Sequence, residues 1–95
     1  MNMELLEQRA EMLKVLSHPQ RLCIVRGLQK HRCNVGKIQE KLGLSQSGLS
    51  QHLAKLKSVG IIKGVRQGKE ICYEVVSPEA IAIAEMLMSD IDDCE

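Results

Sequence analysis

The residues of this chain with the most distinctive chemistry are its four cysteines. They stand at positions 23, 33, 72 and 94 and form no C-x-x-C or other close pair. This spacing does not indicate a structural disulfide framework, and in a reducing compartment we expect resting thiols. A thiolate is a nucleophile and a metal ligand, so a cysteine is a candidate for redox or metal chemistry. The alternative for Cys23, in "RLCIV", is a small core residue.

The charges beside two of these cysteines differ in sign. Cys33 lies in "KHRCN", next to cations and directly before a predicted helix start, where a thiolate is stabilised. Cys94 lies in "SDIDDCE" among four carboxylates and near the negative end of a helix, where a thiolate is disfavoured. Cys94 is therefore a weak first nucleophile. Its setting leaves open a mixed sulfur and oxygen metal site, or a solvated and inert tail.

A second chemical group is the polar run "SQSGLSQHL". Its candidates for contact with a partner surround Leu49 and Leu53, and they are Ser45, Gln46, Ser47, Ser50, Gln51 and His52. Gln can pair bidentately with adenine and Ser can reach base edges or phosphates, while Lys55 is placed for the phosphate backbone. The alternative for a Ser- and Gln-rich helix start is ordinary capping. Gly48 either allows a close approach to DNA or is simply tolerated.

The net charge of +1 conceals a strong segregation along the chain. Residues 21–69 carry eleven Lys and Arg against one Glu, a net charge of +10, whereas residues 70–95 carry eight acids and no Lys or Arg. Such asymmetry predicts a basic middle that meets a polyanion. The alternative is a solvated basic surface with no partner.

Helical periodicity and capping residues predict the elements that position these groups. The predicted helices cover residues 3–16, 19–30, 35–42 and 46–60, and a last helix covers 78–93. Asn34 and Ser45 are expected N-caps, and Gly43 is expected to end the third helix in a left-handed conformation. Two short helices joined by a Gly-containing turn predict a helix-turn-helix over 34–58.

Residues 61–76 change from helical to alternating periodicity and predict a β-hairpin that turns at Gly68. Cys72 alternates with its apolar neighbours there and is expected to be structural. The polar residues of this hairpin would hold flanking phosphates or the minor groove, and they are Lys63, Arg66, Gln67 and Lys69.

The last helix is apolar around most of its circumference and therefore needs two neighbours, one of which can be a second subunit. The whole chain, 1–95, is predicted to be a single domain of the mainly α class, a winged helix-turn-helix with a β-hairpin wing. We expect a homodimer formed through the helices at 3–16 and 78–93.

Several classes of protein are not expected. No segment is apolar enough for a membrane span and the start lacks a secretory signal, so we expect a soluble, cytoplasmic protein. No phosphate-binding loop or catalytic constellation is present, so we expect neither an enzyme nor a bound cofactor.

Three segments, "LKVLSHPQRLCIVRGL", "NVGKIQEKLGLSQSGLSQHLAKLKSVGII" and "GKEICYEV", resemble the ArsR/SmtB family of bacterial winged-helix repressors over nearly the whole chain. The resemblance implies a homodimer that binds palindromic double-stranded operator DNA and releases it when a small inorganic effector binds.

The effector differs between branches of that family. The arsenic and cadmium branch has a C-x-C motif where this chain has Asn34 and Gly36, and the zinc branch uses histidines on the last helix, where this chain has none. The branch that senses oxidants or reactive sulfur pairs a cysteine of the second helix with one near the end of the last helix. Cys94 matches the cysteine near the end of the last helix. The position of the cysteine on the second helix aligns with Arg26.

The partner that this resemblance implies for Cys94 is therefore displaced in this chain. Cys23 lies three residues before Arg26 on the same helical stripe, and Cys33 is the alternative partner. The leading expectation is a repressor that senses reactive sulfur species or an oxidant. The alternatives are a repressor that responds to a metal ion or metalloid through thiolate and carboxylate ligands, and a winged-helix module that binds proteins.

Overall fold

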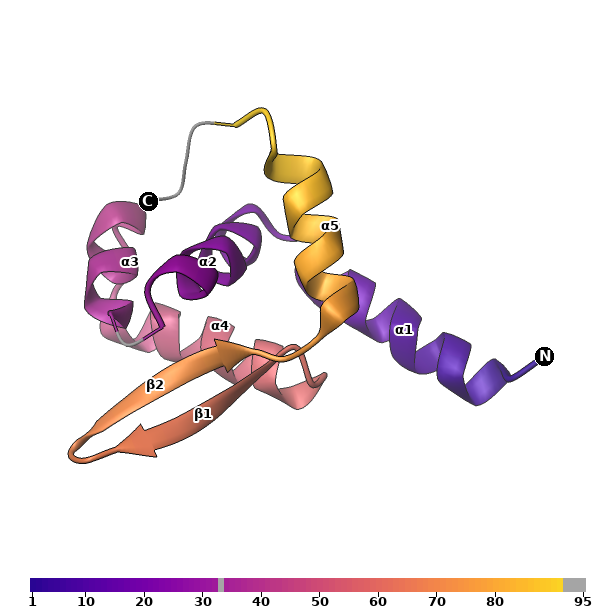
Figure 1. The fold of residues 1–95 in the computed structure, drawn as a ribbon, viewed down its shortest axis with the longest axis horizontal. Helices are drawn as coiled ribbons and strands as arrows, with labels where there is room; N and C mark the ends of the chain where they lie inside the picture. The colour runs from indigo at the N-terminus through magenta and orange to yellow at the C-terminus, as the bar shows by residue number, and fades with distance from the viewer. Residues whose placement is uncertain (33, 92–95) are drawn as a thin grey trace.

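The computed structural model describes residues 1–32 and 34–91. Its elements are α1 (Met3–Leu16), α2 (Pro19–Lys30), α3 (Val35–Leu42), α4 (Gln46–Ser58), β1 (Ile62–Gln67), β2 (Glu70–Val75) and α5 (Pro78–Met88) (Figure 1). This order confirms the predicted winged helix-turn-helix.

The predicted N-caps Asn34 and Ser45 are confirmed, and polar side chains also cap the other helices. The caps of α1, α3, α4 and α5 each accept a hydrogen bond from the backbone amide three residues on, and they are Asn2, Asn34, Ser45 and Ser77. His18 caps α2 differently, because its Nδ1 accepts from the Gln20 amide at 3.1 Å. Such caps are each worth about 1 kcal/mol, so local chemistry fixes most helix starts.

The helix ends follow the sequence less closely. α4 ends at Ser58, and Gly60, which we expect to stop this helix, follows two residues later with φ +76°. α5 was predicted to reach residue 93, but it ends at Met88 and is followed by a turn over 89–91. Its last turn has no cation to offset the helix dipole, and Ser89 and Asp90 are weak helix formers. Residues 92 and 93 lie outside the described residues.

The core is aliphatic and centres on α2. Figure 1 shows α2 in the middle of the molecule, with α3 and α5 on either side of it. The side chains of Ile24, Val25 and Leu28 are fully buried, together with Leu56 of α4 and Ile61. Burial of each such side chain contributes roughly 1.5–3 kcal/mol. This core holds the surface helices in fixed positions.

The turn between α3 and α4 is closed at both ends. Gly43 has φ +64°, and the amide of Leu44 donates to the Gln39 carbonyl at 3.1 Å. The Gln39 side chain donates in return to the Leu44 carbonyl at 3.2 Å. The first bond satisfies a free carbonyl in the last turn of α3, and the second joins α3 to the residue before the cap of α4, so the two together hold α4 relative to α3.

The hairpin forms a two-stranded antiparallel sheet in which Lys63 pairs with Glu74 and Gln67 pairs with Glu70. Gly68 makes the turn with φ +64°, as predicted. The Tyr73 amide donates to the Arg32 carbonyl at 2.9 Å, so β2 is tied to the segment that follows α2. Within residues 1–32 and 34–91, no helix is long and apolar enough to cross a bilayer.

Candidate nucleic-acid interface

One side of α4 is polar and exposed while the other is packed into the core. Leu49, Leu53 and Leu56 are buried. The predicted contact residues of α4 that are exposed are Ser45, Gln46, Ser47, Ser50, Gln51 and Lys55. The core thus holds a helix whose free side carries hydroxyl, amide and ammonium groups, which can bind base edges and phosphates.

The first turn of α4 is closely packed around its cap. The Ser45 hydroxyl accepts from the Gly48 amide at 3.0 Å and lies 3.3 Å from the Ser47 hydroxyl. A Cβ at Gly48 would lie 3.1 Å from the Ser45 Oγ, which is closer than nearly all real Cβ contacts. Gly48 therefore leaves room for the cap. Capping and contact with a partner are compatible in Ser45, because the residue is also exposed.

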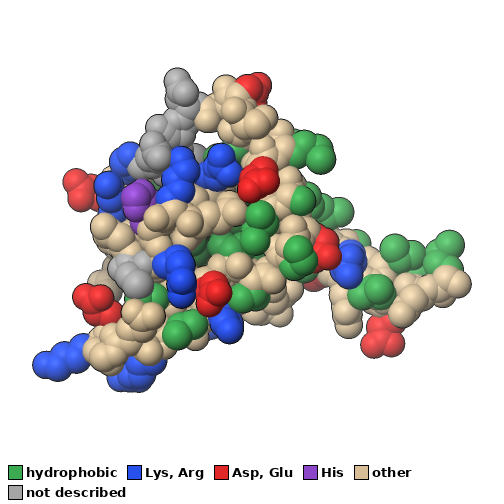
Figure 2. All heavy atoms as spheres, viewed as in Figure 1, with side chains coloured by type: hydrophobic (Ala, Val, Ile, Leu, Met, Phe, Trp, Pro, Cys, Tyr) green, Lys and Arg blue, Asp and Glu red, His purple; other side chains and the backbone are tan. Residues whose placement is uncertain are grey.

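The wing carries its predicted contact residues on the outside. Lys63, Arg66, Gln67 and Lys69 are all exposed. Lys and Arg side chains gather at the free end of the hairpin (Figure 2). The hairpin runs back along the molecule from the end of α4, so that its tip and the start of α4 lie toward the same end in Figure 1. A cationic tip of this kind suits the phosphates beside a groove.

His52 lies differently from the other predicted contact residues of α4. The Arg21 Nε donates to its Nδ1 at 3.1 Å, and its Nε2 lies 3.0 Å from the Gln20 Oε1. Its ring also packs edge-on against that of His18, with centroids 4.8 Å apart. Sequence reasoning grouped His52 with the DNA-facing residues, but both of its ring nitrogens bind α2.

The surroundings of His52 disfavour its charged form. Burial lowers the pKa of the imidazole, and the nearby His18 and Arg21 lower that pKa further. Because a guanidinium can only donate, Nδ1 must be the acceptor and the proton of the neutral ring lies on Nε2. The Nε2–H group then donates to Gln20.

Sequence reasoning missed Arg21 and Gln20. Arg21 also donates through Nη1 to the Val15 carbonyl at 3.2 Å, so one guanidinium joins the end of α1 to α4. The two α2 residues lie more than thirty positions before His52, and no periodicity relates them. Only the packing of α2 against α4 brings them together.

Two of the cysteines belong to the described residues. Cys23 is partly buried on α2, and Cys72 is almost fully buried on β2. Each takes part in a disulfide bond, so this structure shows an oxidised form in place of the thiols that we expect in a reducing compartment. Cys33 and Cys94 lie outside the described residues, and their predicted roles stay predictions.

The metal alternative lacks a ligand set in the part of the chain that the structure describes. Over residues 1–32 and 34–91, no group of three or more His, Cys, Asp or Glu residues is arranged to hold a metal ion. The thiol and carboxylates of 92–95, on which that alternative was based, lie outside these residues.

A helix-turn-helix with an exposed polar second helix and a basic wing defines a winged-helix DNA-binding protein. Residues 18–63 match the family model described as "Bacterial regulatory protein, arsR family". The chain is 45% identical over 83 residues to the transcriptional repressor PagR of Bacillus anthracis, which covers 86% of this chain and 83% of PagR. This protein therefore belongs to the arsR family of bacterial transcription regulators.

Solved structures agree with this assignment. The crystal structure of PagR superposes with a TM-score of 0.80 at 42% identity, covering 90% of this chain and 99% of that one. The structure of reduced HlyU from Vibrio cholerae superposes with a TM-score of 0.79 at 31% identity, with 90% of both chains covered. A homodimeric winged helix-turn-helix domain from Mycobacterium bovis gives 0.77 at 26% identity, covering 90% of this chain and 80% of that one.

Proposed function

We propose that this protein is a homodimeric repressor that binds an operator duplex through α4 and the wing and releases it after oxidation of its cysteines. The observation that carries the DNA-binding part is the exposed polar side of α4, which is held by a buried leucine stripe beside a basic hairpin. The similarity to PagR, a transcriptional repressor, supports the same function.

The proposal gives α4, as the recognition helix, and the wing different tasks. Gln46 and Gln51 are suited to adenine edges in the major groove, with Ser47 and Ser50 beside them. The cationic and polar side chains that would hold phosphates add affinity without selecting a sequence, and they are Lys55, Lys63, Arg66, Gln67 and Lys69.

The dimer would form on the apolar side chains that α1 and α5 leave exposed. These are Leu5, Leu6, Leu13, Met86, Leu87 and the neighbouring Ile91. An apolar hollow lies between the same helices and is lined by residues that include Leu13, Leu22 and Leu87. Figure 2 shows hydrophobic side chains along the projecting α1. Exposed apolar patches of this kind mark interfaces, and the homodimeric Mycobacterium bovis domain has the same fold.

The effector half of the proposal rests on the cysteines. Two thiols would be joined as a disulfide, and their two electrons and two protons would pass to a peroxide or a polysulfide. The disulfide state of Cys23 supports a redox role for α2, and HlyU is a relative whose structure was solved as a reduced form. Cys94 stays the proposed partner of Cys23, with Cys33 as the alternative.

Selection of duplexes from a random pool tests the DNA-binding half. We expect enrichment of a palindromic sequence whose affinity falls steeply with salt. Lys69→Ala is expected to weaken binding to all duplexes and to reduce the salt slope by about one, whereas Gln51→Ala is expected to relax the preferred sequence. Lys14→Ala removes the same charge from α1 and serves as the control. Failure to enrich any duplex would favour a protein-binding module.

Treatment with persulfide or peroxide tests the sensing half. Operator affinity is expected to fall in the wild-type protein and to stay unchanged in Cys94→Ser and Cys23→Ser. Titration with Zn²⁺, Cd²⁺ and As(III) serves as the comparison, because only the metal alternative predicts stoichiometric binding that weakens operator affinity. An unchanged affinity after oxidation of the wild type would contradict cysteine sensing.

A further inference from the structure

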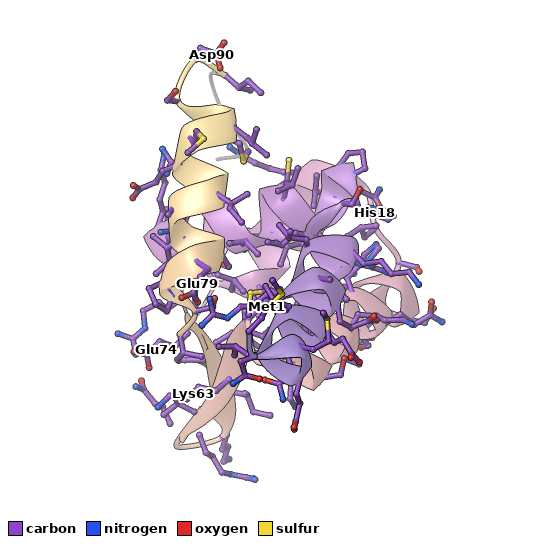
Figure 3. The ribbon with its side chains drawn as sticks, turned by 90° about the vertical axis from the view of Figure 1, so that its right-hand side faces the viewer. Met1, His18, Lys63, Glu74, Glu79 and Asp90 are labelled. Atoms are coloured by element: carbon purple, nitrogen blue, oxygen red, sulfur yellow. The ribbon has the colours of Figure 1, made fainter. Side chains whose placement is uncertain are left out.

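The contacts of His52 suggest a role for this residue other than DNA contact. They lie on the side of α4 that meets α2, not on the free polar side. The hollow beside them is lined by Arg21, His52 and Lys55 together with Gln51, Ala54 and Ser58, and no carboxylate lines it. Figure 3 labels His18, which caps the start of α2.

We propose that His52 is a positioning residue, which holds the recognition helix against α2 through Arg21 and Gln20, and that its protonation weakens operator binding. This inference rests on the proposed DNA-binding function. It adds a residue that sets the orientation of α4 without touching the duplex.

The proton decides whether this arrangement can persist. In the neutral ring, Nδ1 accepts from Arg21 and Nε2–H donates to Gln20, so all three polar groups are satisfied. A second proton, on Nδ1, would place an N–H donor of His52 opposite the Nε–H donor of Arg21 and would bring the imidazolium and guanidinium charges together. The Arg21 contact must then open.

The charged groups around His52 all act in the same direction. From α2, Arg21 and His18 lie against the ring, and Lys55 of α4 lines the same hollow. Burial is the largest cause of the lowered pKa of His52, and His18 and Arg21 lower that pKa further. No neighbouring carboxylate among the residues lining the hollow could stabilise the imidazolium.

The sign of the pH effect separates this role from direct DNA contact. A histidine that faces phosphates binds more tightly when it is protonated, because it gains a positive charge next to a polyanion. If the histidine instead positions α4, the protein binds DNA more weakly when that histidine is protonated, because protonation breaks the contact that holds the helix. The two roles therefore predict opposite slopes of affinity against pH.

The experiment measures the affinity of the full-length protein, under reducing conditions and at constant ionic strength, for a duplex selected at about pH 8. We expect the wild type to lose affinity progressively as the pH falls below 6.5, the ordinary pKa from which that of His52 is lowered, because protonation of the ring then becomes significant. His52→Asn keeps an acceptor at the position of Nδ1 but does not titrate. It is expected to bind within about threefold of the wild type at pH 8 and to lose most of the pH dependence.

His31 supplies the matched control, because it follows the end of α2 and His31→Asn leaves the contacts of His52 in place. This variant is expected to keep the wild-type slope. His18→Asn retains a good N-cap residue for α2 but removes a neighbour that lowers the pKa of His52, so it should move the fall in affinity to higher pH. The inference would be overturned if His52→Asn and the wild type showed the same slope of affinity against pH. It would also be overturned if the wild type bound more tightly at low pH and His52→Asn abolished that gain.

A second measurement tests the contact without DNA. In an NMR titration of the free protein, His52 is expected to take up its proton with a pKa below its ordinary value of 6.5. Arg21→Met is expected to raise the pKa of His52, since it removes a facing charge. No change in that variant would contradict the contact. Failure to select a duplex would instead contradict the proposed function, so the two failures are distinguishable.

Discussion

The carbonyl of Arg32 accepts a hydrogen bond from the amide of Tyr73, and this bond joins the end of α2 to the second strand of the wing. The Arg32 side chain reaches the same strand, where its Nη2 lies 3.8 Å from the Glu74 carboxylate. The wing is therefore attached to the body of the molecule along β2 as well as through its two ends.

The ion pair is expected to contribute much less to this attachment than the backbone bond. Both side chains are about half exposed, and exposed ion pairs are typically worth about 0.2–1 kcal/mol. Glu74→Gln should therefore change the free energy of unfolding in urea by less than about 1 kcal/mol. A loss several times larger would show that this ion pair holds the wing in place.

Gly43 and Gly36 provide a matched pair for the backbone of the helix-turn-helix. Gly43→Ala places a Cβ on a left-handed backbone with φ +64° and should cost about 1–2 kcal/mol. Gly36 lies within α3, and a Cβ there would meet nothing within 4 Å. Gly36→Ala should therefore stabilise the protein by about 0.4–1 kcal/mol. Urea unfolding of both variants checks the opposite signs, and equal effects would contradict the assigned turn.

Leu56 connects the recognition helix to the core. Its side chain is fully buried, so Leu56→Ala should cost about 2–5 kcal/mol through lost transfer energy and a cavity. Thermal and urea unfolding measure this loss. The control is Ala54→Gly, which changes an exposed position of the same helix and should cost only about 1 kcal/mol. Similar losses in the two variants would place Leu56 outside the core.

Leu87 tests the proposed dimer. Its side chain is 53% exposed in the single chain and lines the apolar hollow with Leu13. Leu87→Glu should place a charge in the interface and give a monomer in sedimentation at concentrations where the wild type is a dimer. Glu85→Gln, on the same helix, is the control and should stay dimeric. A dimeric Leu87→Glu protein would exclude this surface as the interface.

Folding stability should fall in mild acid because of His52. Its pKa in the folded protein lies below the ordinary value of 6.5, so the unfolded chain takes up the proton first as the pH falls. The contribution of neutral His52 to folding stability is therefore complete above the pKa of the unfolded chain, and it is lost as the pH falls through the lower pKa of the folded protein. Urea unfolding between about pH 8 and pH 5 should show this loss in the wild type and a smaller loss in His52→Asn. Identical losses would assign the effect to other groups.

Local signals predicted most of the fold. Asn34, Gly43, Ser45 and Ser77 act within one helical turn of their own positions, so α3 and the starts of α4 and α5 were predicted to the residue. The bounds of α1 and α2 followed from helical periodicity and from Pro19. The end of α5 was not, because an apolar pattern alone does not show where a helix stops. Lack of a cation in the last turn is a weaker signal than a cap.

The candidate site was predictable only where exposure follows from helix geometry. Ser47, Gln51 and Lys55 are exposed because they lie across the helix from the leucines at 49, 53 and 56, which are buried. The contact of His52 with Arg21 depends on how two helices cross, which no local pattern records. The disulfide state of Cys23 and Cys72 likewise depends on tertiary contacts and on redox conditions.

The closed turn between α3 and α4 has one more consequence for the proposed repressor. Gln39 and Leu44 form two hydrogen bonds across this turn, and Gly43 has a left-handed conformation, so these contacts hold α3 and α4 at a set angle as one unit. Such a unit cannot adjust to a new half-site spacing by bending at its turn. In the proposed dimer, the distance between the two recognition helices is therefore set by the angle at which the two subunits meet.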